Sequence, residues 1–124
     1  RDWHRAAVIE MGASKQDDIR LLTDIARPTV GIITNAGPAH LEGFGGTLQH
    51  VARGKGELFA GLGPGATAVI NRDDAFHDYW RGVNRAGRTL SYGTGAGADF
   101  RATDIRVEAL PDGSPGLVFR LVMP

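Results

Sequence analysis

The sequence predicts an α/β domain in which a mainly parallel sheet is flanked by helices, with an antiparallel hairpin at its C-terminal end. Two observations favour this fold class. Apolar runs typical of buried strands alternate with helical patterns along residues 6–93, which is the order of parallel βαβ units. Residues 103–123 instead alternate apolar and polar side chains on either side of a proline- and glycine-containing turn, which is a hairpin signal.

The first elements are predicted as a strand, a helix and a second strand. Residues 6–11 are an apolar run ending in an acid, which favours a strand buried on both faces. Residues 14–26 fit a helix with Ser14 as its N-cap and with an apolar stripe of Ile19, Leu22, Ile25 and Ala26. Pro28 ends that helix, and residues 29–34 read as a second buried strand.

A glycine-rich loop over residues 35–46 leads to a predicted helix over residues 47–62 whose apolar face includes a lysine. Spacings of three, four and seven place Lys55 on the same face as Leu48, Val51, Leu58, Phe59 and Leu62. Three explanations stay open. The stem can pack on that face while the ammonium reaches water, the desolvated amine can act as a nucleophile or Schiff-base former, or the amine can add CO₂ and become an anionic carbamate.

The next elements are a third strand, a helix and a fourth strand. Residues 63–71 supply a turn and a strand that ends at Asn71. Asp73 or Asp74 can cap the helix that follows, which Gly87 closes at the C-cap, and its core face is predicted to contain Phe76, Tyr79, Trp80 and Val83. The fourth strand is residues 89–93.

Composition excludes several classes of function. Basic and acidic residues number 14 each, without the basic patch of a nucleic-acid-binding protein. There is no cysteine, which removes disulfides and thiolate chemistry, and no apolar run approaches the roughly 18 residues of a membrane span. We expect a cytoplasmic monomer. The chain has no initiator methionine and a predicted strand within its first ten residues, so we expect it to be a fragment.

Several polar side chains are predicted to meet at one edge of the sheet. Ligands of open parallel sheets bind outside the carboxyl ends of the strands, where this chain has Glu10, Thr34, Asn35, Asn71, Asp73 and Asp74. His40 lies in the loop leaving the second strand, and Lys55 lies about two turns into the next helix. A carboxylate, an imidazole and a lysine therefore converge there.

Each of these groups has a structural and a chemical interpretation. Glu10 can cap a helix or pair with an arginine, or it can be a ligand for Mg²⁺, which prefers carboxylate oxygens. His40 can be satisfied by the backbone of its loop, or it can bind a metal, for which Mn²⁺ or Zn²⁺ is more usual than Mg²⁺. The remaining histidines have no comparable context and are assigned to the surface or to packing; they are His4, His50 and His77.

Two glycine-containing stretches imitate nucleotide-binding motifs. Residues 82–89, "GVNRAGRT", nearly match the pattern GxxxxGK[ST], but a phosphate loop follows a strand and opens a helix, whereas this stretch ends a helix and opens a strand. Residues 43–46, "GFGG", are too short to be a fingerprint. We therefore predict no phosphate loop within these 124 residues.

Four stretches in order resemble the central, ATP-binding domain of the Mur ligases. They are "VIEMGASKQDDI", "ITNAGPAHLEGFGG", "VARGKGELFAGL" and "AVINRDD", and the resemblance covers residues 6–93. It is strongest to the branch that adds D-alanyl-D-alanine to UDP-N-acetylmuramoyl-tripeptide in peptidoglycan synthesis. Ala39 precedes His40 here, whereas branches that add single amino acids commonly place an aspartate before this histidine.

The resemblance implies an ATP-dependent ligase that forms an amide bond through an acyl phosphate. The resemblance implies that the glutamate at the position of Glu10 and the histidine at the position of His40 contact Mg²⁺. It also implies that the lysine at the position of Lys55 is commonly carbamylated and supports the metal site. Asn35 and Asn71, at the strand ends, are candidate contacts to ATP. Such a site suits phosphoryl transfer, which depends on positioning and on cations that neutralise developing charge.

The resemblance also implies that residues 1–124 are a partial central domain. The family's phosphate loop lies upstream of the first strand, and its adenine-contacting element lies downstream of the hairpin. We therefore expect the isolated chain to have no ligase activity and to bind ATP poorly. The alternatives are another Mur ligase, an enzyme like folylpolyglutamate synthetase, a metal-dependent phosphoesterase, or a nucleotide-binding module without enzymatic activity.

Overall fold

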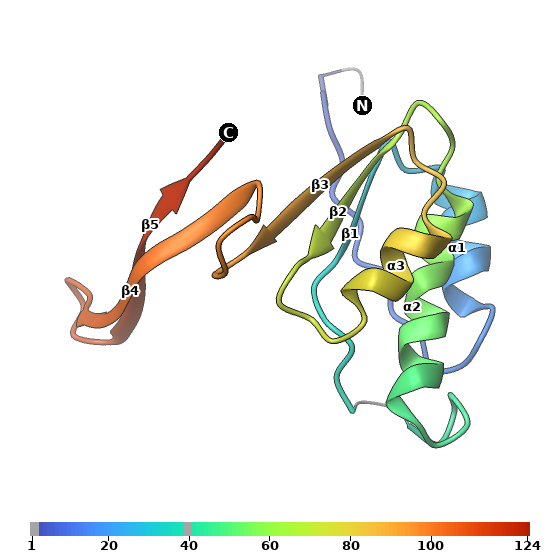
Figure 1. Ribbon diagram of the computed structural model, residues 1–124, viewed down its shortest axis with the longest axis horizontal. Helices are drawn as coiled ribbons and strands as arrows, with labels where there is room; N and C mark the ends of the chain where they lie inside the picture. Colours follow the sequence, from blue (N-terminus) through green and yellow to red (C-terminus); the bar gives the residue numbers. More distant parts are fainter. Residues whose placement is uncertain (1–2, 39–40) are drawn as a thin grey trace.

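The computed structural model describes residues 3–38 and 41–124. It contains three helices and five strands within those ranges (Figure 1), in the order α1 (Asp18–Ala26), β1 (Val30–Ile33), α2 (Leu48–Gly61), β2 (Thr67–Asn71), α3 (His77–Val83), β3 (Arg88–Gly93), β4 (Phe100–Ala109) and β5 (Pro115–Val122). None of the helices described has the length and hydrophobicity needed to span a bilayer.

The strands form one mixed sheet, which confirms the predicted fold class. Their order is β1-β2-β3-β4-β5, with the pairs from β1 to β4 parallel and β4–β5 antiparallel. The hairpin joins β3 through the pairs Tyr92–Phe100 and Gly93–Arg101. It projects away from the helices (Figure 1), so the antiparallel end is an appendage, as the alternating sequence predicts.

The three helices lie on the same side of the parallel strands (Figure 1). For α2 and α3 this follows from the topology, because each connects neighbouring parallel strands and such crossovers are almost always right-handed. Gly31 and Ile33 of β1 are buried, and Gly31 lies against Leu58 and Leu62 of α2. Val30 and Ile32 on the opposite face are 53% and 55% exposed. The prediction that residues 29–34 are a buried strand is therefore correct for one face only.

Residues 6–11 do not form a strand, so that prediction was wrong. Val8 is fully exposed and Ile9 is 62% exposed, and no strand of the described ranges pairs with this segment. A β-strand is defined by its hydrogen-bonded neighbour. The apolar composition of residues 6–11 favours burial, but it supplies no partner.

Helix α1 begins at Asp18, and Ser14 is not its N-cap. The amide and hydroxyl of Ser14 instead donate to Asp18 Oδ2 at 2.9 and 3.2 Å. The start of the helix is capped from α2, because the Glu57 carboxylate accepts from the amides of Asp17 and Arg20 at 2.8 and 3.0 Å. Such contacts satisfy amides that a helix leaves unpaired at its start.

The predicted apolar stripe of α1 is only partly buried. Ile19 is 5% exposed and Thr23 is 2% exposed, but Ile25 is 72% exposed. The helix therefore turns a narrow side toward α2, its main packing neighbour. The predicted stripe was wrong at Ile25 and missed the buried threonine.

Helix α2 is the centre of the core. Thr47 caps it by accepting from the His50 amide at 3.3 Å. The predicted apolar face is buried except at the first helical residue, Leu48, which is 39% exposed. The glycine at position 54 is explained by contact, because a Cβ there would collide with the Phe44 ring, and a Cβ at Gly56 would lie only 3.2 Å from the Tyr79 ring.

Helix α3 ends at Val83 with Asn84 as its C-cap, so Gly87 is not the cap. Gly87 is instead required by close approach, because a Cβ there would collide with the carbonyl oxygen of Pro64. Trp80 on the predicted core face is fully buried, whereas Tyr79 is 37% exposed. Residues 82–89 join a helix to a strand, as predicted, and not in the order that a phosphate loop requires.

Candidate functional site

The carboxyl ends of β1 and β2 bring two predicted site residues together. The side-chain amide of Asn71 donates to the carbonyl oxygen of Thr34 at 2.8 Å. Asn71 Oδ1 also accepts from the amide of Asp73 at 2.9 Å. The side chain of Asn71 therefore links the two strand ends and stabilises the turn that follows β2.

Lys55 also reaches this edge of the sheet. Its Nζ donates to the carbonyl oxygen of Asn35 at 2.7 Å, and the residue is partly buried. The stem runs along the apolar face of α2 while the ammonium lies at the strand end, as expected for an amphipathic side chain. A cation on the apolar face is thus accommodated by a hydrogen bond at the rim.

The two adjacent aspartates after β2 have different partners. Asp74 Oδ2 accepts from the amide of Ala36 at 3.0 Å, and its Oδ1 accepts from the amide of Phe76 at 2.8 Å, just before α3. Asp73 Oδ2 accepts from the amide and hydroxyl of Thr94 at 2.6 and 2.8 Å. The Thr94 amide, followed by its hydroxyl, holds the pKa of Asp73 below its ordinary value. Asp74 therefore holds the exit of β1, and Asp73 holds the exit of β3.

The sequence reasoning missed Tyr92. Its hydroxyl donates to the carbonyl oxygens of Thr34 and Ile33 at 3.0 and 3.3 Å. Burial, followed by the charges of Asp74 and Asp73, raises its pKa above the ordinary value. The signal was present, because Tyr92 stands at the end of a predicted strand, the same criterion that selected Asn35 and Asn71.

The predicted metal ligands are not tested by the geometry. Glu10 lies on an exposed segment, and His40 lies outside the described residues. Within the ranges that the structure covers, no three His, Cys, Asp or Glu side chains gather as a metal site would require. By ligand chemistry the Glu10 carboxylate suits Mg²⁺, whereas an imidazole at position 40 is a more usual ligand of Mn²⁺ or Zn²⁺.

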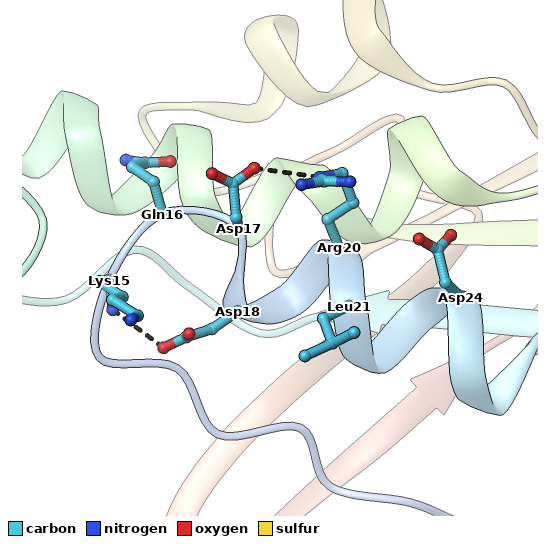
Figure 2. A pocket seen from close by; sticks show the side chains of 7 residues that line it. All are labelled: Lys15, Gln16, Asp17, Asp18, Arg20, Leu21 and Asp24. Atoms are coloured by element: carbon cyan, nitrogen blue, oxygen red, sulfur yellow. Dashed lines mark hydrogen bonds and ion pairs between the residues drawn. The ribbon is translucent and has the colours of Figure 1, made fainter.

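A shallow hollow lies elsewhere, at the start of α1 (Figure 2). Lys15, Asp17, Arg20 and Asp24 are among the residues that line it, and an ion pair of 3.0 Å joins Asp17 to Arg20. None of the predicted site residues that the structure describes lines this hollow. The edge formed by the ends of β1, β2 and β3 is therefore the better candidate site.

Comparison with known protein families identifies the class to which this fold belongs. The Mur ligase middle domain family matches residues 1–119, and the chain belongs to this family. The family resemblance found in the sequence is thereby confirmed.

The similar proteins include ligases named for UDP-N-acetylmuramoyl-tripeptide and D-alanyl-D-alanine. UDP-N-acetylmuramoyl-tripeptide–D-alanyl-D-alanine ligase of Haemophilus influenzae is 35% identical over 98% of this chain and 24% of its own length. MurF from Acinetobacter baumannii superposes with a TM-score of 0.86 at 30% identity, over 100% of this chain and 26% of that structure. MurF ligase from Thermotoga maritima in complex with ADP gives 0.67 at 31% identity, over 88% and 26%. The chain spans about a quarter of the length of these relatives.

Proposed function

We propose that this chain is part of the ATP-using middle domain of a ligase that joins D-alanyl-D-alanine to UDP-N-acetylmuramoyl-tripeptide. The carrying observation is the 35% identity to a ligase of that name across 98% of the chain. In the reaction, ATP phosphorylates the terminal carboxylate of the tripeptide. The amine of the dipeptide then attacks the acyl phosphate, an amide forms, and ADP and phosphate leave.

Mg²⁺ belongs to this proposal, with Glu10 and His40 as the residues that would hold it. When bound, the metal neutralises charge that develops on the transferred phosphoryl group. Lys55 lies at the same edge through its bond to the Asn35 carbonyl. A carbamate on Lys55 would place a negative charge there and support the cation.

Asn35 is the stronger of the two candidate contacts to ATP. Asn71 uses both ends of its side-chain amide within the protein, on Thr34 and on Asp73. Asn35 contributes its backbone carbonyl to Lys55, and its side chain is exposed to solvent. A nucleotide at this edge would therefore meet Asn35 without breaking a bond that holds the strand ends together.

The proposal extends to the organisation of the longer protein. Residues 1–124 form a partial central domain, and the phosphate loop and the adenine-contacting element belong to segments outside it. A cytoplasmic location is part of the proposal, because the proposed reaction uses ATP and a UDP-linked peptide. We expect the longer protein to act as a monomer, which sedimentation velocity can test.

Expression of the full reading frame that contains these residues tests the activity. The purified product is expected to release phosphate from ATP only when both UDP-N-acetylmuramoyl-tripeptide and D-alanyl-D-alanine are present. Phosphate release that does not depend on the dipeptide would contradict the proposal and favour a metal-dependent phosphoesterase. The isolated 124-residue chain is the control, and we expect no turnover from it.

Intact-mass measurement tests the carbamate. The full-length protein, gently ionised in bicarbonate, is expected to carry a labile addition of one CO₂. The 124 residues contain two lysines, Lys15 and Lys55, so Lys15→Ala is a matched control that should keep the addition while Lys55→Ala loses it. Fully active enzyme without the addition would overturn the carbamate.

A further inference from the structure

The backbone that leaves β1 is held by side chains and not by a neighbouring strand. Regular pairing of β1 with β2 ends at Ile33–Ile70. Beyond it, side chains make hydrogen bonds to consecutive peptide groups of residues 33–36, here called the exit contacts. They come from Lys55, Asn71, Asp74 and Tyr92.

The exit contacts tie residues 33–36 to four separate parts of the fold. Lys55 belongs to α2, Asn71 ends β2, Asp74 precedes α3, and Tyr92 belongs to β3. Two of the side chains are themselves fixed, because Asp74 also accepts from the Phe76 amide and Asn71 from the Asp73 amide. The path of the chain after β1 is therefore determined from several directions.

The need to hydrogen-bond the backbone carbonyl groups does not by itself explain this number of contacts. The bonds to the Thr34 and Asn35 carbonyls lie at an exposed position, where water can satisfy a carbonyl oxygen. Fixing long side chains such as lysine costs rotamer entropy. Four side chains on successive peptide groups indicate that the position of this backbone matters, and not only its hydrogen bonding.

We propose that Asp74 and Tyr92 are positioning residues that, through the exit contacts, set where the loop after β1 leaves the sheet. This inference rests on the proposed function in one respect. The loop includes position 40 of the sequence, and the role of His40 as a metal ligand is part of that proposed function. Neither residue is assigned to contact a substrate or the metal. Their effect acts through the backbone of residues 34–36.

Amide hydrogen exchange of the 124-residue chain tests the contact itself. Asp74→Asn leaves one acceptor oxygen for two amides, so exchange at Ala36 or Phe76 should rise about tenfold, the loss expected for one hydrogen bond to a charged group. The same substitution at the neighbouring residue, Asp73→Asn, should raise exchange at Thr94 and leave Ala36 unchanged. Unchanged exchange at both Ala36 and Phe76 in Asp74→Asn would overturn the proposal.

Tyr92→Phe provides a second variant, because it removes one hydroxyl and no packing volume. The carbonyl carbon resonance of Thr34 should shift in this variant, while that of Asn35, which accepts from Lys55, should shift less. If Asp74→Asn fails to fold, this variant still decides the question. No shift at Thr34 would count against the role of Tyr92.

Turnover by the full reading frame separates positioning from simple stabilisation. At a temperature where each variant is fully folded, Tyr92→Phe and Asp74→Asn should lower kcat about tenfold with little change in KM for D-alanyl-D-alanine, as when a transition-state interaction is lost. Asp112→Asn, a matched substitution in the turn of the hairpin where the carboxylate accepts from the Ser114 amide, should retain kcat. Normal kcat despite faster exchange at Ala36 would reduce the exit contacts to a structural role and overturn the proposal. An inactive unsubstituted protein would instead refute the proposed function, and the exchange and resonance data would still decide whether the contacts hold the backbone.

Discussion

The indole N–H of Trp80 donates to the carbonyl oxygen of Ala52 at 3.0 Å, across the buried contact between α3 and α2. Both residues are fully buried, and the same indole lies beside Gly56, where a Cβ would be 3.3 Å from Trp80 Cδ1. The glycine allows the ring to approach α2 closely enough for its N–H to reach a helical carbonyl. Packing and hydrogen bonding at this contact therefore depend on each other.

Trp80→Phe should destabilise the fold by about 1–3 kcal/mol, because it removes a buried hydrogen bond and leaves a cavity. The other tryptophan, Trp3, is 71% exposed and offers the matched control Trp3→Phe, expected to stay within about 0.5 kcal/mol. Urea denaturation measures both. Equal losses from the two substitutions would contradict the described contact.

Gly87→Ala should cost about 1–3 kcal/mol through overpacking, because its Cβ would collide with the backbone of Pro64. Backbone cannot move aside as a flexible side chain can. Gly82→Ala is the control: no atom lies within 4 Å of its Cβ, and alanine in a helix should gain up to about 1 kcal/mol. Thermal denaturation of the pair should shift the midpoints in opposite directions.

Glu57→Gln should weaken the start of α1 by about 1 kcal/mol, the usual contribution of a helix cap. Glutamine has one acceptor oxygen, whereas the Glu57 carboxylate accepts from two amides, those of Asp17 and Arg20. Hydrogen exchange at these amides measures the effect directly. Glu42→Gln changes an exposed glutamate in the same way and should leave exchange at α1 unaltered.

Acid should loosen the segment between β3 and β4. The Thr94 amide lowers the pKa of Asp73, and the Ser91 hydroxyl, followed by its amide, lowers the pKa of Asp99, in each case from 3.8. A carboxyl whose pKa is lower in the folded state stabilises the fold above its unfolded pKa, and this stabilisation is lost as pH falls through the folded value.

The urea midpoint should therefore fall as pH decreases between about pH 5 and about pH 2. The protection factors of the Ser91 and Thr94 amides, which are corrected for the pH dependence of intrinsic exchange, should fall over the same interval, since these amides donate to the two carboxylates. Asp73→Asn and Asp99→Asn together should flatten the pH dependence. A dependence as steep in the double variant as in the unsubstituted chain would place the responsible groups elsewhere.

Features that depend on local pattern were predictable from the sequence. The face of α2 and the C-terminal hairpin follow from periodicity, and the meeting of Thr34 and Asn71 follows from the geometry of parallel strands. Lys55 was correctly placed near the strand edge, because helical spacing fixes its face and its distance along the helix. Family membership followed from the order of four motifs, which is more specific than any one of them.

Features that depend on a distant partner were not predictable in this way. Residues 6–11 have strand composition but no strand beside them among the described residues. Ser14 resembles an N-cap, yet Glu57, about forty positions away, performs that task. Gly87 was predicted to be a helix C-cap, whereas glycine is required there because a Cβ would collide with Pro64. In each case the deciding group is remote in sequence, and a local pattern cannot identify it.

The hairpin of β4 and β5 makes few backbone connections to the strands that form the candidate site. It joins the parallel strands through two residue pairs, and its turn, residues 110–114, is exposed and distant from the helices (Figure 1). Exposed loop tips of this kind tolerate insertions. The turn is therefore a suitable place to insert an affinity tag or a fluorophore-binding peptide, so that the domain can be immobilised or followed in solution without modifying the edge where the strands end.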